Sequence, residues 1–203
     1  MAPFSLHAFE ITPELVYQME AKYGQAAVHR LEDLRSVIEK SRHKNERMKI
    51  KAVNDYFNRF PYSRDIIVWK KEDHWATPIE MLGMHGADCE DYSIAKYFTL
   101  REMGVPVEKL QIMYLQLKPN DVNQPHMVLA YYETPTASPL ILDNMEEDIL
   151  PADAREDITP IYSFNSEGVW LLNSRGEGRR ISSSSRIKLW SDMNMRLVEQ
   201  TSY

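Results

Sequence analysis

The sequence predicts an α+β domain in which helices come first and an antiparallel sheet follows. Apolar residues recur at helical spacing through about the first hundred residues, and shorter runs with strand-like character replace them afterwards. Turn-forming Gly and Pro lie between the later runs, as is typical of antiparallel strands. Helices followed by a series of strands indicate the α+β class. A length of 203 residues suits one domain. We expect a helical lobe over residues 1–60 and a core over residues 61–203 that ends mostly in strands.

Three helices are predicted before residue 60. Thr12 followed by Pro13 is typical of a helix start, because Thr caps the first turn and Pro fits its first position. Apolar residues at helical spacing predict two more helices, within residues 26–40 and 48–57. We expect the last of them to stop before Pro61, because proline interrupts a helix.

A short helix and a long one are predicted next. Thr77, Pro78 and Glu80 form a capping box with proline at the first helical position, so a short helix begins there and ends at the glycines of residues 83–86. A second helix starts close to Cys89 and continues to about residue 103. Its apolar residues occupy most of the circumference, which predicts a helix buried in the centre of the domain.

Strands are predicted after residue 110, and a final helix closes the chain. The expected strands are residues 111–117, 126–132, 139–143, 161–164 and 169–172. Helical spacing returns over residues 187–198.

Charge and composition exclude some classes of partner. The net charge of -6 argues against nucleic acid, whose phosphates reward dense clusters of Lys and Arg. No apolar run approaches the roughly 20 residues needed to span a bilayer, so we expect no membrane insertion. No signal peptide follows Met1, which leaves two readings: a cytoplasmic protein, or a secreted one whose leader lies outside this sequence.

The sequence contains one cysteine, Cys89, so it cannot form an intrachain disulfide. A buried, unreactive thiol is the ordinary expectation for a lone cysteine. Here the predicted position at a helix start favours a nucleophile. Free backbone N–H groups and the positive end of the helix dipole stabilise a thiolate there and can bind an oxyanion.

His126 and Asp143 are the predicted base and orienting carboxylate. If Tyr132 pairs near Pro139 in a hairpin, paired residue numbers sum to about 271. His126 then lies opposite a position near 145, within about two residues of Asp143. Each residue alone is more often structural. Together with Cys89 they supply nucleophile, base and orienter, which predicts a catalytic triad.

Acidic residues around Cys89 are expected to oppose a thiolate. Asp88, Glu90 and Asp91 flank it, and like charge raises a thiol pKa. A bound Ca²⁺ would resolve the conflict, because it takes six to eight oxygen ligands. The alternative is an acidic first turn that complements the helix dipole. The spacing is not that of an EF-hand loop, so calcium at these three residues stands as a hypothesis.

Several segments resemble the bacterial transglutaminase-like cysteine proteinases, and the LapG-type periplasmic proteases in particular. The resemblance covers roughly residues 50 to 175. One position departs from the family's usual Gly-Asp-Cys, since Ala87 precedes Asp88 here. The matching segments are residues 75–78 (WATP), 87–97 (ADCEDYSIAKY), 126–132 (HMVLAYY), 140–144 (LILDN), 162–165 (YSFN) and 168–171 (GVWL).

The resemblance implies a papain/transglutaminase-like core and a calcium-dependent endopeptidase of the periplasm, with a signal peptide outside this sequence. It implies that the substrate is a large cell-surface adhesin, cut near its N-terminus at paired alanines, so that cleavage controls biofilm dispersal. It also implies sequestration by an inner-membrane receptor of the LapD type that responds to cyclic di-GMP. The family's calcium ligands correspond to Asp88 and Glu90, with Asp91 as a further candidate.

Two other functions remain open at this level. A true transglutaminase would use the same triad and admit an amine in place of water, since both reactions share an acyl-enzyme. A non-catalytic transglutaminase-like binding module is expected to lack a triad residue, whereas all three are present. The backbone N–H of Cys89 is the expected oxyanion donor. The indole of Trp75 is a weaker candidate, because a packed core Trp is the commoner case.

Overall fold

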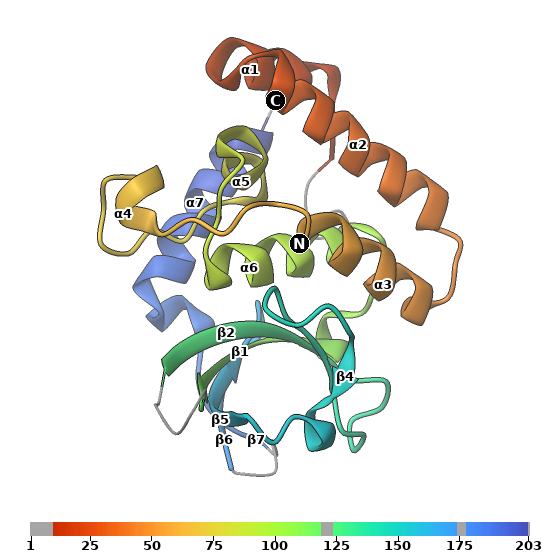
Figure 1. Cartoon of the computed structure of the whole chain (residues 1–203), viewed down its shortest axis with the longest axis vertical. Coiled ribbons are helices and arrows are strands. Elements are labelled where there is room, and N and C mark those ends of the chain that lie inside the picture. Colours follow the sequence, from red (N-terminus) through yellow and green to blue (C-terminus); the bar gives the residue numbers. More distant parts are fainter. Residues whose placement is uncertain (1–9, 119–123, 174–177, 203) are drawn as a thin grey trace, which may run out of the picture.

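Helices from the first half of the chain pack on one face of an antiparallel sheet formed by the second half (Figure 1). The computed structural model describes residues 10–118, 124–173 and 178–202. In this part of the chain no helix is both long and apolar enough to cross a lipid bilayer. The α+β class predicted from the sequence is confirmed.

Two helices begin where the capping signals of Thr12 and Thr77 predict. Thr12 accepts a hydrogen bond from the backbone of Leu15, and Thr77 and Glu80 form the expected reciprocal capping box. Only the four-residue helix α4 had no sequence signal. The described helices are α1 (Pro13–Tyr23), α2 (Gln25–Ser41), α3 (Glu46–Phe57), α4 (Asp65–Val68), α5 (Pro78–Met84), α6 (Cys89–Glu102) and α7 (Lys188–Thr201).

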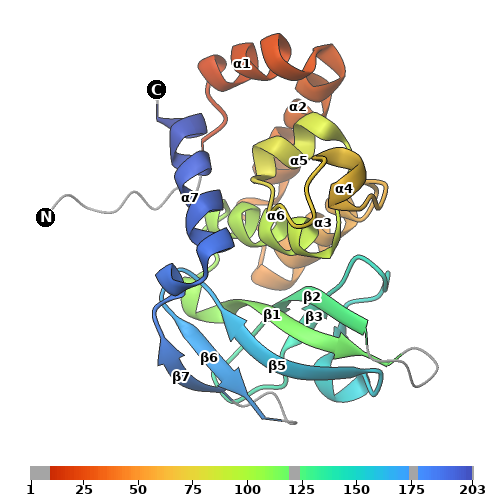
Figure 2. The ribbon, with the colours of Figure 1, turned by 90° about the vertical axis from the view of Figure 1, so that its left-hand side faces the viewer.

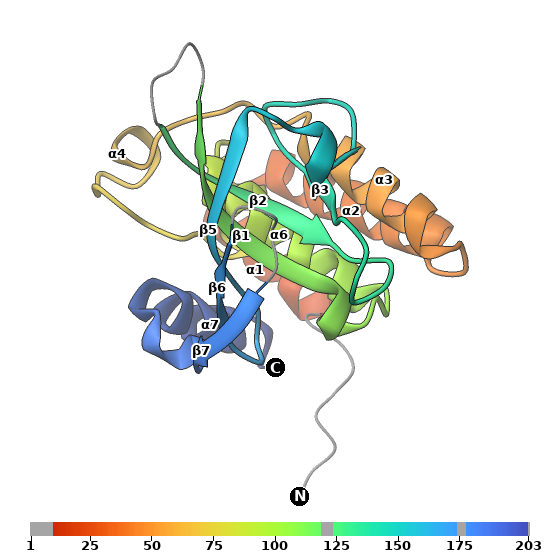
Figure 3. The ribbon, with the colours of Figure 1, turned by 90° about the horizontal axis from the view of Figure 1, so that it is seen from below.

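Helix α6 lies in the centre, as predicted. It is buried all round, with Ile94, Ala95 and Leu100 fully excluded from solvent. It packs against α3, α5 and the sheet, and Figure 3 shows it directly behind the sheet. Because its body is enclosed on every side, its N-terminus is the end that can present side chains to a cleft.

The sheet contains every predicted strand and two short ones that were not predicted. In the described residues the strand order is β4-β3-β2-β1-β5-β6-β7, and every pairing between neighbours is antiparallel. The unpredicted strands, β4 and β7, are edge strands with little or no apolar alternation. The strands are β1 (Leu110–Leu117), β2 (Gln124–Tyr131), β3 (Leu140–Leu142), β4 (Leu150–Pro151), β5 (Ile158–Phe164), β6 (Val169–Leu172) and β7 (Gly178–Ser182).

The register between β2 and β3 follows the predicted hairpin. Leu129 pairs with Leu142 and Tyr131 with Leu140, so paired numbers sum to 271. This register places the start of β2 and the residue after β3 at the same end of the hairpin.

Helix α7 returns to the helical layer (Figure 2). Glu80 anchors it there. The Glu80 carboxylate accepts hydrogen bonds from Arg196 at 3.2 Å, from Gln200 at 3.1 Å and from the backbone of Thr77 at 2.9 Å. Arg196 also donates to the carbonyl oxygen of Trp75 at 2.6 Å. Burial alone would raise the pKa of Glu80, but hydrogen bonds from His74, the Thr77 backbone and Arg196, together with the Arg196 charge, lower it to about 2.

We expect Glu80→Gln to lower the free energy of unfolding by about 2 kcal/mol at pH 7, because hydrogen bonds to a buried carboxylate are lost or weakened. The depressed pKa means that this contribution is present above pH 4.5 and is lost as the pH falls towards 2. Urea unfolding of both proteins at several pH values measures the difference. Glu39→Gln on the exposed face of α2 is the control, and a difference that does not shrink in acid would contradict the assignment.

Candidate active site

A cleft of about 670 Å³ opens where the N-terminus of α6 meets β2. It brings together Cys89 from α6, His126 from β2 and the acidic residues that surround the cysteine. Aromatic rings form part of its wall, with Tyr114 and Tyr162 stacked at 5.0 Å between ring centroids. The cleft therefore combines a reactive polar end with an apolar surface.

Cys89 is the first residue of α6, directly after the N-cap residue Asp88. Its thiol donates a hydrogen bond to Glu90 at 3.1 Å. Burial, followed by the charge of Glu90 and its hydrogen bond, raises the thiol pKa, whereas the backbone N–H of Met127 lowers it. Met127 is the neighbour of His126, so this contact places the sulfur beside the start of β2.

His126 and Asp143 form the pair expected from the register. The Nε2 atom of His126 lies 2.7 Å from Oδ1 of Asp143, and both side chains are buried. This contact occupies Nε2 and leaves Nδ1 of the imidazole free of Asp143. Burial would raise the pKa of Asp143, but the His126 hydrogen bond and charge, the backbone N–H of Met145 and the charge of Arg155 lower it to about 2. Asp143 is therefore ionised at neutral pH.

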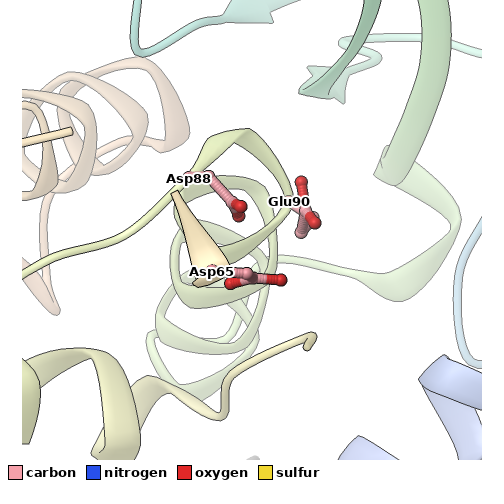
Figure 4. A group of neighbouring side chains, drawn as sticks. All are labelled: Asp65, Asp88 and Glu90. Atoms are coloured by element: carbon pink, nitrogen blue, oxygen red, sulfur yellow. The ribbon is translucent and has the colours of Figure 1, made fainter. Parts of the chain in front are cut away.

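Three carboxylates meet at the start of α6, and one of them was not predicted. Ligand oxygens of Asp65, Asp88 and Glu90 all lie within 4.8 Å of one another (Figure 4). Asp65 is the first residue of α4, which lies between Pro61 and Trp69. A four-residue helix is too short to show periodicity, so the sequence carried no signal that this Asp approaches Cys89.

The cluster is electrostatically unfavourable by itself. Burial, then the charges of Glu90, Asp91 and Asp65, raises the pKa of Asp88. Burial likewise raises the pKa of Asp65 to about 6. One oxygen of Asp65 and one of Asp88 are buried without a hydrogen-bond partner among the described residues. Such a donor set, made only of hard oxygen atoms, matches a divalent cation of the Ca²⁺ type.

The structure does not bring Asp91 into this cluster. Its side chain is almost fully buried and accepts a hydrogen bond from the backbone of Ala76 at 2.7 Å. Successive residues of a helix point about 100° apart, so Asp91 faces the segment before α5 while Glu90 faces the cleft. Asp91 thereby anchors the loop that carries Trp75.

Trp75 lines the cleft as a packed aromatic residue. It is 6% exposed, stacks on Phe164 at 5.5 Å, and its side chain hydrogen-bonds to Asp73. The backbone N–H of Cys89, at the open end of α6, remains the clearest oxyanion donor.

A cysteine at a helix start that shares a cleft with a His–Asp pair on an antiparallel sheet defines the papain-related, transglutaminase-like class of cysteine peptidase. The sequence profile of one family, described as bacterial transglutaminase-like cysteine proteinase, matches residues 22–171. The chain belongs to this family and is a cysteine peptidase.

Solved structures of LapG from Legionella pneumophila are similar over nearly the whole chain. An EGTA-treated LapG is 36% identical, with a TM-score of 0.80, and the match covers 93% of this chain and 99% of LapG. A second LapG structure has the same identity and coverage and a TM-score of 0.78. A calcium-bound LapG is 37% identical, with a TM-score of 0.78 and coverages of 92% and 99%. No curated protein matches by sequence.

In the presence of a chelator, we expect Asp88→Asn to raise the free energy of unfolding by about 1 kcal/mol at pH 7, because it removes an acid whose ionised form is disfavoured by burial and by the neighbouring carboxylates. Because folding raises the pKa of this acid, wild-type Asp88 lowers the free energy of unfolding by an amount that grows as the pH rises above 3.8. Urea unfolding at pH 4 and pH 8 tests both the sign and the trend. Asp148→Asn, at an exposed site, should change little, and a loss of stability in Asp88→Asn would refute the repulsion.

Proposed function

We propose that Cys89, His126 and Asp143 act as nucleophile, general base and orienting carboxylate in peptide-bond hydrolysis. The main support is the cleft that Cys89, at the start of α6, shares with His126. The His126 side chain is buried and lies 2.7 Å from the Asp143 carboxylate. Asp143 fixes which nitrogen of His126 bears its proton and which one meets the thiol. Family membership supports the reaction class.

The reaction begins when His126 takes the thiol proton and the sulfur of Cys89 attacks the scissile carbonyl carbon. The backbone N–H of Cys89 stabilises the resulting oxyanion. His126 then protonates the leaving amine, the C–N bond breaks, and a thioester remains on Cys89. Water attacks the thioester after giving a proton to His126, which returns it to the sulfur as the carboxylic acid leaves.

We infer that the enzyme works with Ca²⁺ held by Asp65, Asp88 and Glu90. The mutual proximity of these carboxylates and the unpartnered buried oxygens of Asp65 and Asp88 support this assignment. A LapG relative is calcium-bound, which supports it independently. The ion would neutralise the charge around Cys89 and draw Glu90 away from the thiol. Asp91 would act indirectly, through the Ala76 backbone that it holds.

For the biological role we propose a periplasmic protease that cuts a large surface adhesin near its N-terminus, at paired alanines, and so controls biofilm dispersal. We further propose that an inner-membrane receptor of the LapD type, responsive to cyclic di-GMP, sequesters it. The motifs shared with LapG-type proteases and the 36% identity to LapG over 93% of the chain support these assignments. The apolar wall of the cleft, with exposed Tyr62 at its rim, suits an extended peptide.

We expect the purified protein to cut a paired-alanine peptide and an adhesin fragment, and Cys89→Ala or His126→Ala to lower kcat by about four orders of magnitude. Chromatography of the products measures cleavage. His43→Ala, at an exposed loop position, is the control for the histidine variant.

Cleavage that survives Cys89→Ala would refute the triad. Cleavage of the peptide but not of the adhesin fragment would refute only the substrate. Incorporation of a primary amine faster than hydrolysis would favour a transglutaminase.

We expect EGTA to reduce cleavage strongly and added Ca²⁺ to restore it. Ca²⁺ should also raise the melting temperature, because a ligand that binds only the folded state stabilises it by about 2.7 kcal/mol at 100 times its Kd. Asp65→Asn should weaken Ca²⁺ binding in calorimetry by about tenfold or more, since it removes a charged ligand.

Asp91→Asn tests whether Asp91 binds Ca²⁺ directly or only holds the Ala76 backbone. Its amide oxygen can still accept the Ala76 N–H, so the structure predicts near-normal Ca²⁺ affinity for this variant. A loss as large as that of Asp65→Asn would make Asp91 a ligand. Unchanged affinity in Asp65→Asn would refute the three-carboxylate site.

A further inference from the structure

The second oxygen of Asp143 is held by a residue outside the triad. Nη2 of Arg155 donates to Oδ2 of Asp143 at 3.1 Å, and the guanidinium is buried. The first oxygen, Oδ1, accepts hydrogen bonds from Nε2 of His126 at 2.7 Å and from the backbone N–H of Met145 at 3.0 Å. Each carboxylate oxygen therefore has its own donors, so rotation about the side-chain bonds would break at least two contacts.

Arg155 is itself held by a second carboxylate, that of Asp157. Nε donates to Oδ1 and Nη2 to Oδ2 of Asp157, both at 2.8 Å, which is the two-point geometry that orients a guanidinium most firmly. Arg155 follows a short 3₁₀ turn, Ala152–Ala154, and precedes β5, whereas Asp143 follows β3. The contacts thus tie the loop before β5 to the end of the hairpin that carries His126.

We propose that Arg155, oriented by Asp157, is a positioning residue that holds the Asp143 carboxylate in the rotamer that orients His126. The proposal rests on the triad assigned above. Arg155 acts through Asp143 and is not placed against substrate. Removing the outer partner of a metal ligand costs about 10- to 100-fold in affinity or activity, and we expect a loss of the same order here.

The Lys96 amine is a second basic group that interacts electrostatically with Asp143. Lys96 of α6 is fully buried, and its Nζ has no hydrogen-bond partner among the described residues. Burial lowers the pKa of Lys96 to about 7, and the charge of Asp143 opposes that shift. On the backbone side, Asn58 donates to the Asp143 carbonyl oxygen at 2.8 Å. Among these groups and His126, only Arg155 is bonded to Oδ2.

A double-mutant cycle on kcat tests whether Arg155 acts through Asp143. With the paired-alanine peptide as probe, Arg155→Met should lower kcat by about 10- to 100-fold and change KM less than about twofold. In an Asp143→Ala background, the same change should cost less than about twofold, because the contact is already lost. Arg155→Lys should restore part of the loss, and Arg179→Met on the exposed strand β7 should have no effect.

A spectroscopic measurement decides the same point without substrate. The Nε2–H proton of His126, bonded to Asp143, should give a downfield ¹H NMR resonance in the wild type and in Arg179→Met. In Arg155→Met it should shift or broaden. If that variant does not fold, Asp157→Asn replaces it in both experiments, since Arg155 then keeps its charge and loses the two-point contact that orients it.

Equal losses of kcat in the two backgrounds, or an unchanged resonance in a folded variant, would overturn the proposal. If the wild type fails to cut the peptide while the resonance responds to Arg155, the proposed substrate is wrong and the positioning role stands.

Discussion

The burial of α6 is the constraint on which the rest of the site depends. The helix lies between the helical layer and the sheet with side chains buried on every face, so its direction cannot change without disrupting the core. Its first turn consequently has a fixed place beside the start of β2. Cys89 lines the same cleft as His126 because a rigid central helix places it there, and not because a loop presents it.

This placement concentrates opposite charges on the two sides of the reacting atoms. Carboxylates gather around the thiol at the helix start, while Arg155 is paired with the Asp143 carboxylate that bonds His126, and the Lys96 amine interacts with that carboxylate electrostatically. The carboxylates around the thiol repel one another and can bind a cation from solution. The charge of Asp143 is compensated within the protein, since Arg155 is paired with both Asp143 and Asp157. We interpret the charge around the cysteine as dependent on a bound cation, and the charge around the histidine as balanced by the protein itself.

Local physics explains which elements could be anticipated. The caps at Thr12 and Thr77 act within one helical turn, and the β2–β3 register follows from a short connection, so each can be read from neighbouring residues. The edge strands β4 and β7 have no such signal, because pairing with an existing sheet and not apolar alternation defines them. Asp65 and Arg155 were missed for a related reason, since each reaches the site from a segment whose local pattern is that of a loop.

The sequence by itself therefore determined the fold class, the helix starting at Cys89, and the hairpin that pairs His126 with Asp143, because these depend on interactions between near neighbours. Family membership was also evident in the residues around those three positions. Only the tertiary structure decided which carboxylates surround the cysteine. In it, Asp91 accepts a hydrogen bond from the Ala76 backbone, Asp65 joins Asp88 and Glu90 instead, and Arg155 donates to Asp143. These are contacts between distant segments, and their geometry is set by how the buried helix and the sheet pack together.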